Sequence, residues 1–139
     1  MLHTFIRSLV RAAALVILAA AALAPLAQAE LLGSSTSASG LELTIDSELS
    51  TVPLNRIHSW RLSLTDASGK PVTAAHVEVR GGMPEHDHGL PTAPIVAAVD
   101  EPGRFLLQGI RFHMPGSWRL FFTIEHDGLS EVIEFELEL

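Results

Sequence analysis

Two histidines and a methionine stand close together in one short stretch of this chain. Met83, His86 and His88 fall among glycines and prolines, in a protein that contains no cysteine. Imidazole nitrogens and a thioether sulfur, without a thiolate, are the donors that suit copper. In an extended loop His86 and His88 point the same way, because side chains two residues apart share a face. The stretch therefore predicts a copper site.

A second stretch, which runs from Phe112 to Trp118, adds His113 and Met114 just before a proline and a glycine. We take His86 and His88 as the primary ligands, Met83 as the soft ligand, and His113 or Met114 as the group that completes the site. Zinc would suit the histidines, but it would leave the methionines without a role. The alternative is structural: a solvated His-x-His loop, with both methionines packed as irregular hydrophobic side chains.

Alternating apolar and polar residues predict the strands that must position these side chains. The last strand is the clearest example, because Ile133, Phe135 and Leu137 alternate with glutamates. We expect an all-β fold, a seven-stranded antiparallel β-sandwich of the immunoglobulin-like kind, with Trp60 and Trp118 in its core. The predicted strands lie around residues 41–46, 57–65, 72–80, 95–99, 104–112, 118–125 and 133–139.

Strand direction predicts where the candidate ligands lie. If all seven strands alternate in direction, the loops 49–56, 81–94 and 112–117 emerge at the same end of the sandwich. The five candidate ligands and His58 then gather at that end, and His126 lies at the opposite end. Because two packed sheets are about 10 Å apart, this argument predicts proximity but no closer geometry. For His58 and His76, which sit in strand patterns, we favour structural roles.

The first 29 residues have the features of a signal peptide. A basic start is followed by an apolar run, and then by the small-residue pattern Ala27-Gln28-Ala29. Cleavage there predicts a periplasmic or extracellular protein, whereas a retained segment would act as a membrane anchor. Residues 30–40, rich in serine and glycine, predict a flexible leader. Residues 41–139 then form a single domain.

Charge and motifs narrow the functional classes. The net charge is −7, and it becomes −9 once Arg7 and Arg11 are removed with residues 1–29. Nothing basic is clustered in the remainder, which argues against nucleic acid as a partner. There is no cysteine nucleophile, no Gly-x-Ser-x-Gly motif and no His-Glu-x-x-His motif. We therefore expect a protein that is not an enzyme.

A series of short motifs resembles those of a known family. The motifs are Met83-Pro84, His86-x-His88-Gly89, Pro91-Thr92-Ala93-Pro94, the segment that runs from Gly103-Arg104-Phe105 to Gly109-Ile110-Arg111-Phe112, and Met114-Pro115-Gly116-Ser117-Trp118. Together they make residues 41–139 similar to the YtkA-like/FixH-like family of small exported β-sandwich domains. The resemblance implies an immunoglobulin-like fold outside the cytoplasm, and some relatives are linked with copper handling or cytochrome oxidase assembly. FixH-type proteins keep a membrane segment, and this chain departs from them there.

Two functions of different classes follow. In the first, an exported non-catalytic protein binds copper through its Met/His loop, for periplasmic metal handling or oxidase assembly. In the second, the same loop docks a membrane or periplasmic protein without metal, and Met83, Leu90, Pro91 and Pro94 form an exposed apolar patch. A weaker third alternative is a small ligand held between the sheets, which requires a cavity that the aliphatic pattern does not suggest.

Overall fold

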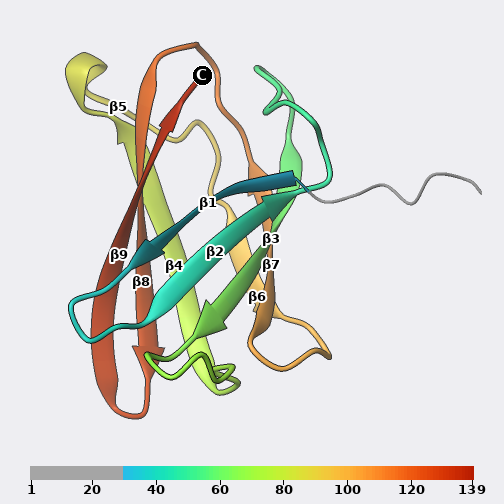
Figure 1. Cartoon of the computed structure of the whole chain (residues 1–139). Helices are drawn as coiled ribbons and strands as arrows, with labels where there is room; N and C mark the ends of the chain where they lie inside the picture. Colours follow the sequence, from blue (N-terminus) through green and yellow to red (C-terminus); the bar gives the residue numbers. More distant parts are fainter. Residues whose placement is uncertain (1–29) are drawn as a thin grey trace, which may run out of the picture.

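Two antiparallel sheets, packed face to face, make up residues 30–139, which are the residues that the computed structural model describes (Figure 1). The five-stranded sheet has the order β1-β2-β3-β7-β6, and the four-stranded sheet has the order β5-β4-β8-β9. The elements are β1 (Glu30–Thr36), β2 (Glu42–Ser47), β3 (His58–Thr65), β4 (Ala75–Met83), the 3₁₀ turn η1 (Pro84–His86), β5 (His88–Gly89), β6 (Ile95–Ala98), β7 (Arg104–Ile110), β8 (Ser117–His126) and β9 (Leu129–Glu138). Within residues 30–139 no helix is long and apolar enough to cross a membrane.

The β-sandwich predicted from the alternating pattern is confirmed. All seven predicted strands form, as β2, β3, β4, β6, β7, β8 and β9. The structure adds two further strands, β1 and the short β5, so the described residues contain nine strands rather than seven. The predicted signal peptide, residues 1–29, lies outside the described residues.

Strand β1 occupies the segment for which the composition favours a flexible leader. It pairs antiparallel with β2, from Glu30 opposite Ser47 to Thr36 opposite Glu42. Gly33 lacks a side chain where there is no room for one, because a Cβ atom at this position would lie 2.8 Å from the ring of Phe135 on β9. The backbone of β1 can therefore pass close over that ring. In a segment whose composition suggests flexibility, Gly33 instead permits close packing.

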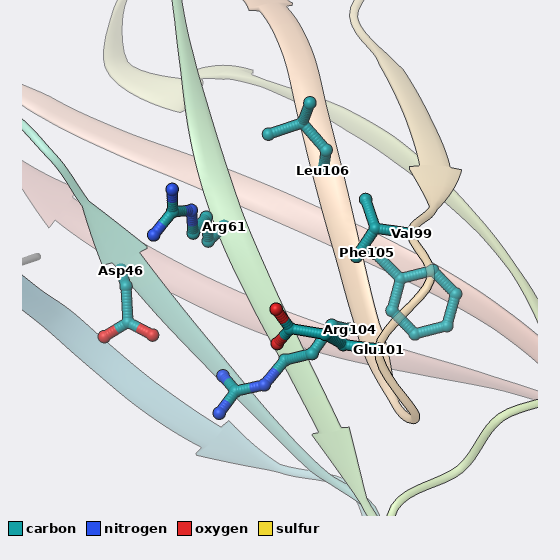
Figure 2. A pocket seen from close by; sticks show the side chains of 7 residues that line it. All are labelled: Asp46, Arg61, Val99, Glu101, Arg104, Phe105 and Leu106. Atoms are coloured by element: carbon teal, nitrogen blue, oxygen red, sulfur yellow. The ribbon is translucent and has the colours of Figure 1, made fainter.

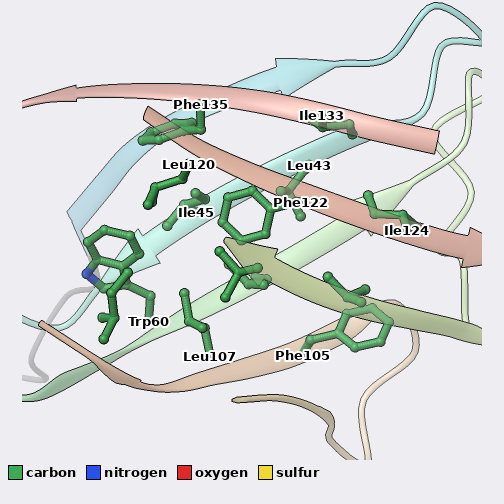
Figure 3. Close-up of a cluster of buried hydrophobic side chains, with 14 of the residues drawn as sticks. Leu43, Ile45, Trp60, Phe105, Leu107, Leu120, Phe122, Ile124, Ile133 and Phe135 are labelled. Carbon is green, nitrogen blue, oxygen red and sulfur yellow. The ribbon is translucent and has the colours of Figure 1, made fainter. Parts of the chain in front are cut away.

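The core lies between the sheets and follows the predicted period of two. Trp60, Leu62 and Leu64 of β3 point inward, as do Trp118 and Leu120 of β8, and each is at most 1% exposed. Figure 3 shows Leu43, Phe122 and Phe135 interleaved from both sheets. Both tryptophans are thus buried, as the sequence predicts, and each of them stands near the end of the sandwich where the Met/His loops meet.

Three loops meet at one end of the sandwich, the upper end in Figure 1. They connect β2 to β3, β4 to β6, and β7 to β8. The backbone N–H of Asn55 donates to the carbonyl of Phe112 over 2.7 Å. The Thr92 hydroxyl donates to the carbonyl of Gly109, also over 2.7 Å. The first bond ties the β2–β3 loop to the β7–β8 loop, and the second ties the β4–β6 loop to the end of β7, just before the β7–β8 loop. The expectation from strand direction is therefore confirmed for the loops.

The opposite end holds His126. Its Nε2 atom lies 3.4 Å from a carboxylate oxygen of Glu131, to which the Ser39 hydroxyl donates over 2.7 Å. This contact joins the β1–β2 turn to β9 and the β8–β9 hairpin. His126 thus belongs to a structural contact far from the candidate ligands.

Candidate functional site

Met83 and His88 are brought together by a tight return of the chain. After Met83 the turn η1 reverses direction, Asp87 adopts a left-handed conformation with φ of 52°, and β5 pairs back onto β4 with His88 opposite Met83. Residues directly opposite each other in antiparallel strands point to the same face, with Cβ atoms about 4.5–5.5 Å apart. Met83 is buried, at 2% exposure, and His88 is exposed at the rim above it.

The pairing of β5 with β4 depends on Gly82. A Cβ atom on Gly82 would collide with the carbonyl oxygen of His88. Only glycine therefore lets β5 approach β4 closely enough for His88 to stand over Met83. The sequence signal is the Gly81-Gly82 pair before Met83, which from the sequence alone indicates only a loop.

His113 approaches His88 from the β7–β8 loop. The centroids of the two rings are 5.5 Å apart, with their planes at 84°. The Nδ1 atom of His113 is buried and has no hydrogen-bond partner among residues 30–139. A buried ring nitrogen without a partner is costly, unless a ligand or a water satisfies it.

The loop that carries His113 is held in place from two sides. The indole Nε1 of Trp118 donates to the carbonyl of Met114 over 3.1 Å, and the ring of Trp118 lies 5.4 Å from that of His113. Gly116 and Leu139 exchange backbone hydrogen bonds of 2.7 and 3.1 Å. The sequence pattern predicts Trp118 as a core residue only. The structure makes it the support of the candidate site as well.

The spacing of the rings can be compared with that of two imidazoles on one metal ion. With metal–nitrogen distances of about 2.0–2.1 Å, each ring centroid lies roughly 3.2 Å from the ion, so two such rings are about 5–5.5 Å apart at ordinary ligand angles. The 5.5 Å between His88 and His113 fits this spacing. His86 and His88 are stacked 6.3 Å apart at 25°, and they fit it less well.

The five predicted ligands are therefore not equivalent. His88 adjoins three of the others: it pairs with Met83 across β4 and β5, its ring is near that of His113, and it stacks on that of His86. Met114 packs against the core and contacts Trp118 through its carbonyl. In the part of the chain that the structure describes, no three His, Cys, Asp or Glu side chains converge as a preformed metal site. For an ion held by His88 and His113, the remaining candidate ligands are Met83 and, after rotation of its side chain, His86.

Met83 lies directly beneath the second loop. Its methyl carbon is 2.7 Å from the position that a Cβ atom on Gly116 would take. Gly116 itself has φ of 124°, a conformation that favours glycine. The Pro115-Gly116 turn thus brings the His113 loop down onto the thioether. The buried Met83 side chain therefore lies against the turn that follows His113.

His58 lies at the same end but deeper in the sandwich. Its ring is 5.5 Å from that of Trp60 and 5.8 Å from that of Phe112. Nδ1 donates to the carbonyl of Arg56 over 3.0 Å, so the neutral ring leaves Nε2 as an acceptor, and that atom is buried without a partner within the described residues. The structural role favoured for His58 agrees with this aromatic environment.

Burial lowers the pKa of His58 below its ordinary value of 6.5. The hydrogen bond to the Arg56 carbonyl opposes that effect, and the nearby Arg56 charge adds to it. In the unfolded chain His58 takes up a proton near pH 6.5, whereas the folded protein resists protonation. We expect the free energy of unfolding to fall as the pH drops below about 6.5.

The measurement is urea denaturation between pH 5 and 8. The His58→Phe variant should lose much of this pH dependence, because phenylalanine can pack against Trp60 without a proton to take up. His76→Ala, at an exposed position of β4, is the control that should keep it. An unchanged pH dependence in His58→Phe would show that another group causes it.

A groove elsewhere on the surface is lined by no histidine or methionine. It has a volume of about 590 Å³ and lies on the outer face of the five-stranded sheet, between the charged residues Asp46, Arg61, Glu101 and Arg104 (Figure 2). Arg61 pairs with Glu48 at 2.5 Å, and Arg104 donates to the Ser63 hydroxyl. Both signs of charge are interleaved there, so the groove selects neither anions nor cations. The Met/His end remains the candidate site.

Comparison with known proteins agrees with the fold. A family model described as YtkA-like matches residues 38–122, more than half of the chain. The match includes β2 through most of β8, together with all five predicted ligands. No curated protein and no solved structure matches the chain. On the family match and the two-sheet architecture, the chain belongs to the YtkA-like family.

Proposed function

We propose that this protein is an exported, non-catalytic copper-binding protein that takes up the ion at the Met/His end of its sandwich. The observation that carries the proposal is the approach of His88 and His113, which lie on different loops with ring centroids 5.5 Å apart. Copper is the cargo here, and the chain supplies donors for it. The donor set of imidazole and thioether without thiolate is the one that suits copper.

The local structure supports uptake and release rather than permanent storage. His86 and His88 are exposed, so an incoming ion meets them first. His113 is part-buried, and its partnerless Nδ1 gives the ion a nitrogen that no protein group occupies within residues 30–139. The hydrogen bonds to Met114 and Gly116 hold that loop in place before binding, which reduces the ordering cost. An exposed site of this kind suits transfer to a periplasmic or membrane protein.

The metal-independent docking function has less support. It expects an exposed apolar patch of Met83, Leu90, Pro91 and Pro94. Of these four residues only Pro91 is exposed. Met83 is 2% exposed, and Leu90 packs partly against the core. Leu54 and Ile57, at 40% and 66% exposure, are the large apolar side chains on the neighbouring β2–β3 loop. We therefore place metal binding first, and we assign the protein partner to the transfer step.

The test is a competitive titration of the purified protein with Cu(I) and Cu(II) against chromophoric chelators. We expect one ion per chain, and loss of that uptake in the His86→Ala/His88→Ala variant. His76→Ala removes an exposed imidazole away from the site, so it controls for nonspecific binding by surface histidines. Equal uptake by the wild type and the double variant would contradict the proposal and leave docking as the function to pursue.

A further inference from the structure

The candidate donors differ in depth. Met83 is almost completely buried, beneath Gly116 and opposite His88. His86 is exposed, and its ring is stacked on that of His88 at 6.3 Å. His88 adjoins both groups, because it is opposite Met83 in the β4–β5 pairing and stacked on His86, and its ring lies 5.5 Å from that of His113. The sulfur donor is thus on the buried side of the histidine pair, and the extra nitrogen donor is on the exposed side.

We propose, resting on the proposed function, that the site has two donor sets that discriminate the oxidation states of copper. Cu(I) is bound by Met83 with His88 and His113, and Cu(II) is bound by His86 with the same two histidines. The pair His88 and His113 is common to both sets. The oxidation state of the cargo therefore decides which third residue ligates it.

The chemistry of the donors supports this assignment. A thioether is a soft ligand that selects Cu(I), whereas Cu(II) prefers nitrogen and oxygen ligands in tetragonal arrangements. The buried side is also apolar, because Trp118 lies 5.4 Å from His113 and packs on Phe112 at 5.1 Å. Such surroundings exclude water, and they favour the ion of lower charge. On the exposed side, water can complete the coordination of Cu(II).

Passage between the two sets needs one electron and no chemical change in the protein. Cu(II) accepts an electron from an external small-molecule reductant such as ascorbate and becomes Cu(I). His86 is then released and the Met83 sulfur takes its place. No residue of the chain is oxidised in this exchange. The exchange requires rotation of side chains, because no three His, Cys, Asp or Glu side chains of residues 30–139 already converge on one point.

The first arm of the test compares two variants in both oxidation states. Met83→Leu keeps the volume of the side chain and removes the sulfur, a swap that cores usually tolerate. It should weaken Cu(I) binding by at least about tenfold and leave Cu(II) binding unchanged. His86→Ala should weaken Cu(II) binding by a similar factor and leave Cu(I) binding unchanged. Met114→Leu is the matched control, because Met114 packs against the core and should affect neither ion.

X-ray absorption provides a second arm that does not depend on the stability of any variant. The wild-type protein with Cu(I) should show a sulfur neighbour at about 2.3 Å, and the Cu(II) form should show only nitrogen and oxygen. A sulfur in both forms, or in neither, would overturn the inference, as would Met83→Leu weakening both ions equally. If wild-type protein binds neither ion, the proposed function itself fails. If the histidines matter in both states and Met83 in neither, only the two-set inference fails.

Discussion

Replacing His88 or His113 by alanine is expected to weaken copper binding at least about 100-fold in each single variant. Loss of groups that merely orient a ligand costs about 10–100-fold in metal affinity, and loss of a ligand should reach or exceed that range. Both rings belong to the pair that the structure places at 5.5 Å. The measurement is the dissociation constant for Cu(I), by chelator competition, with circular dichroism to verify that each variant is folded.

The double variant His88→Ala/His113→Ala distinguishes one shared ion from two independent ones. If one ion bridges the two rings, removing the second ring costs less than removing the first, and the two effects do not add. If the rings bind separate ions, the losses add and the stoichiometry changes. His126→Ala, at the opposite end of the sandwich, is the control and should leave the affinity unchanged. Additive losses would contradict the single site.

Replacing Trp118 by alanine should produce the largest loss of stability, about 3–5 kcal/mol, as is typical of large aromatic side chains removed from a core. Trp118 is 1% exposed, and its ring contacts those of Phe112 and His113. The change also removes the hydrogen bond that holds the Met114 carbonyl. Chemical denaturation followed by circular dichroism measures the loss. A loss below about 1 kcal/mol would show that Trp118 is not the anchor of this end.

The two tryptophans provide a matched comparison for that hydrogen bond. Trp118→Phe keeps an aromatic ring but leaves the Met114 carbonyl without its donor. Trp60→Phe removes an indole N–H that has no partner among the described residues. We expect Trp118→Phe to be the more destabilising by about 1 kcal/mol, the usual net contribution of one hydrogen bond. It should also weaken copper binding, because the His113 loop is released, whereas Trp60→Phe should not.

The strands and their order along the chain could be read from the sequence, because alternation with a period of two is a local property. Residues such as Ile133, Phe135 and Leu137 show which face of a strand is buried before any partner strand is known. Strand direction then placed the three loops at one end, since successive antiparallel strands must return. The tryptophans followed from the same pattern. These predictions needed no knowledge of how side chains meet across the sandwich.

Strand β1 and the short β5 did not follow from the pattern. The segment Glu30–Thr36 lacks a clear apolar alternation, and its Gly33 permits a close approach to Phe135. β5 is only two residues long and depends on Gly82. Both strands form because their backbones pair with a neighbouring strand, β1 with β2 and β5 with β4. Such pairing depends on the tertiary structure and not on the local sequence pattern. Composition alone therefore favoured flexibility or a loop in both places.

The sequence by itself determined a β-sandwich with methionines and histidines in loops that share one end. Only the tertiary structure decided that His88 meets His113, that Met83 lies buried beneath them, and that Met114 turns to the core. The reason is physical: periodicity assigns each side chain to a face of its own strand, whereas contact between two loops depends on register and loop packing. His88 and His113 are separated by two strands along the chain, and no local pattern records the distance between them.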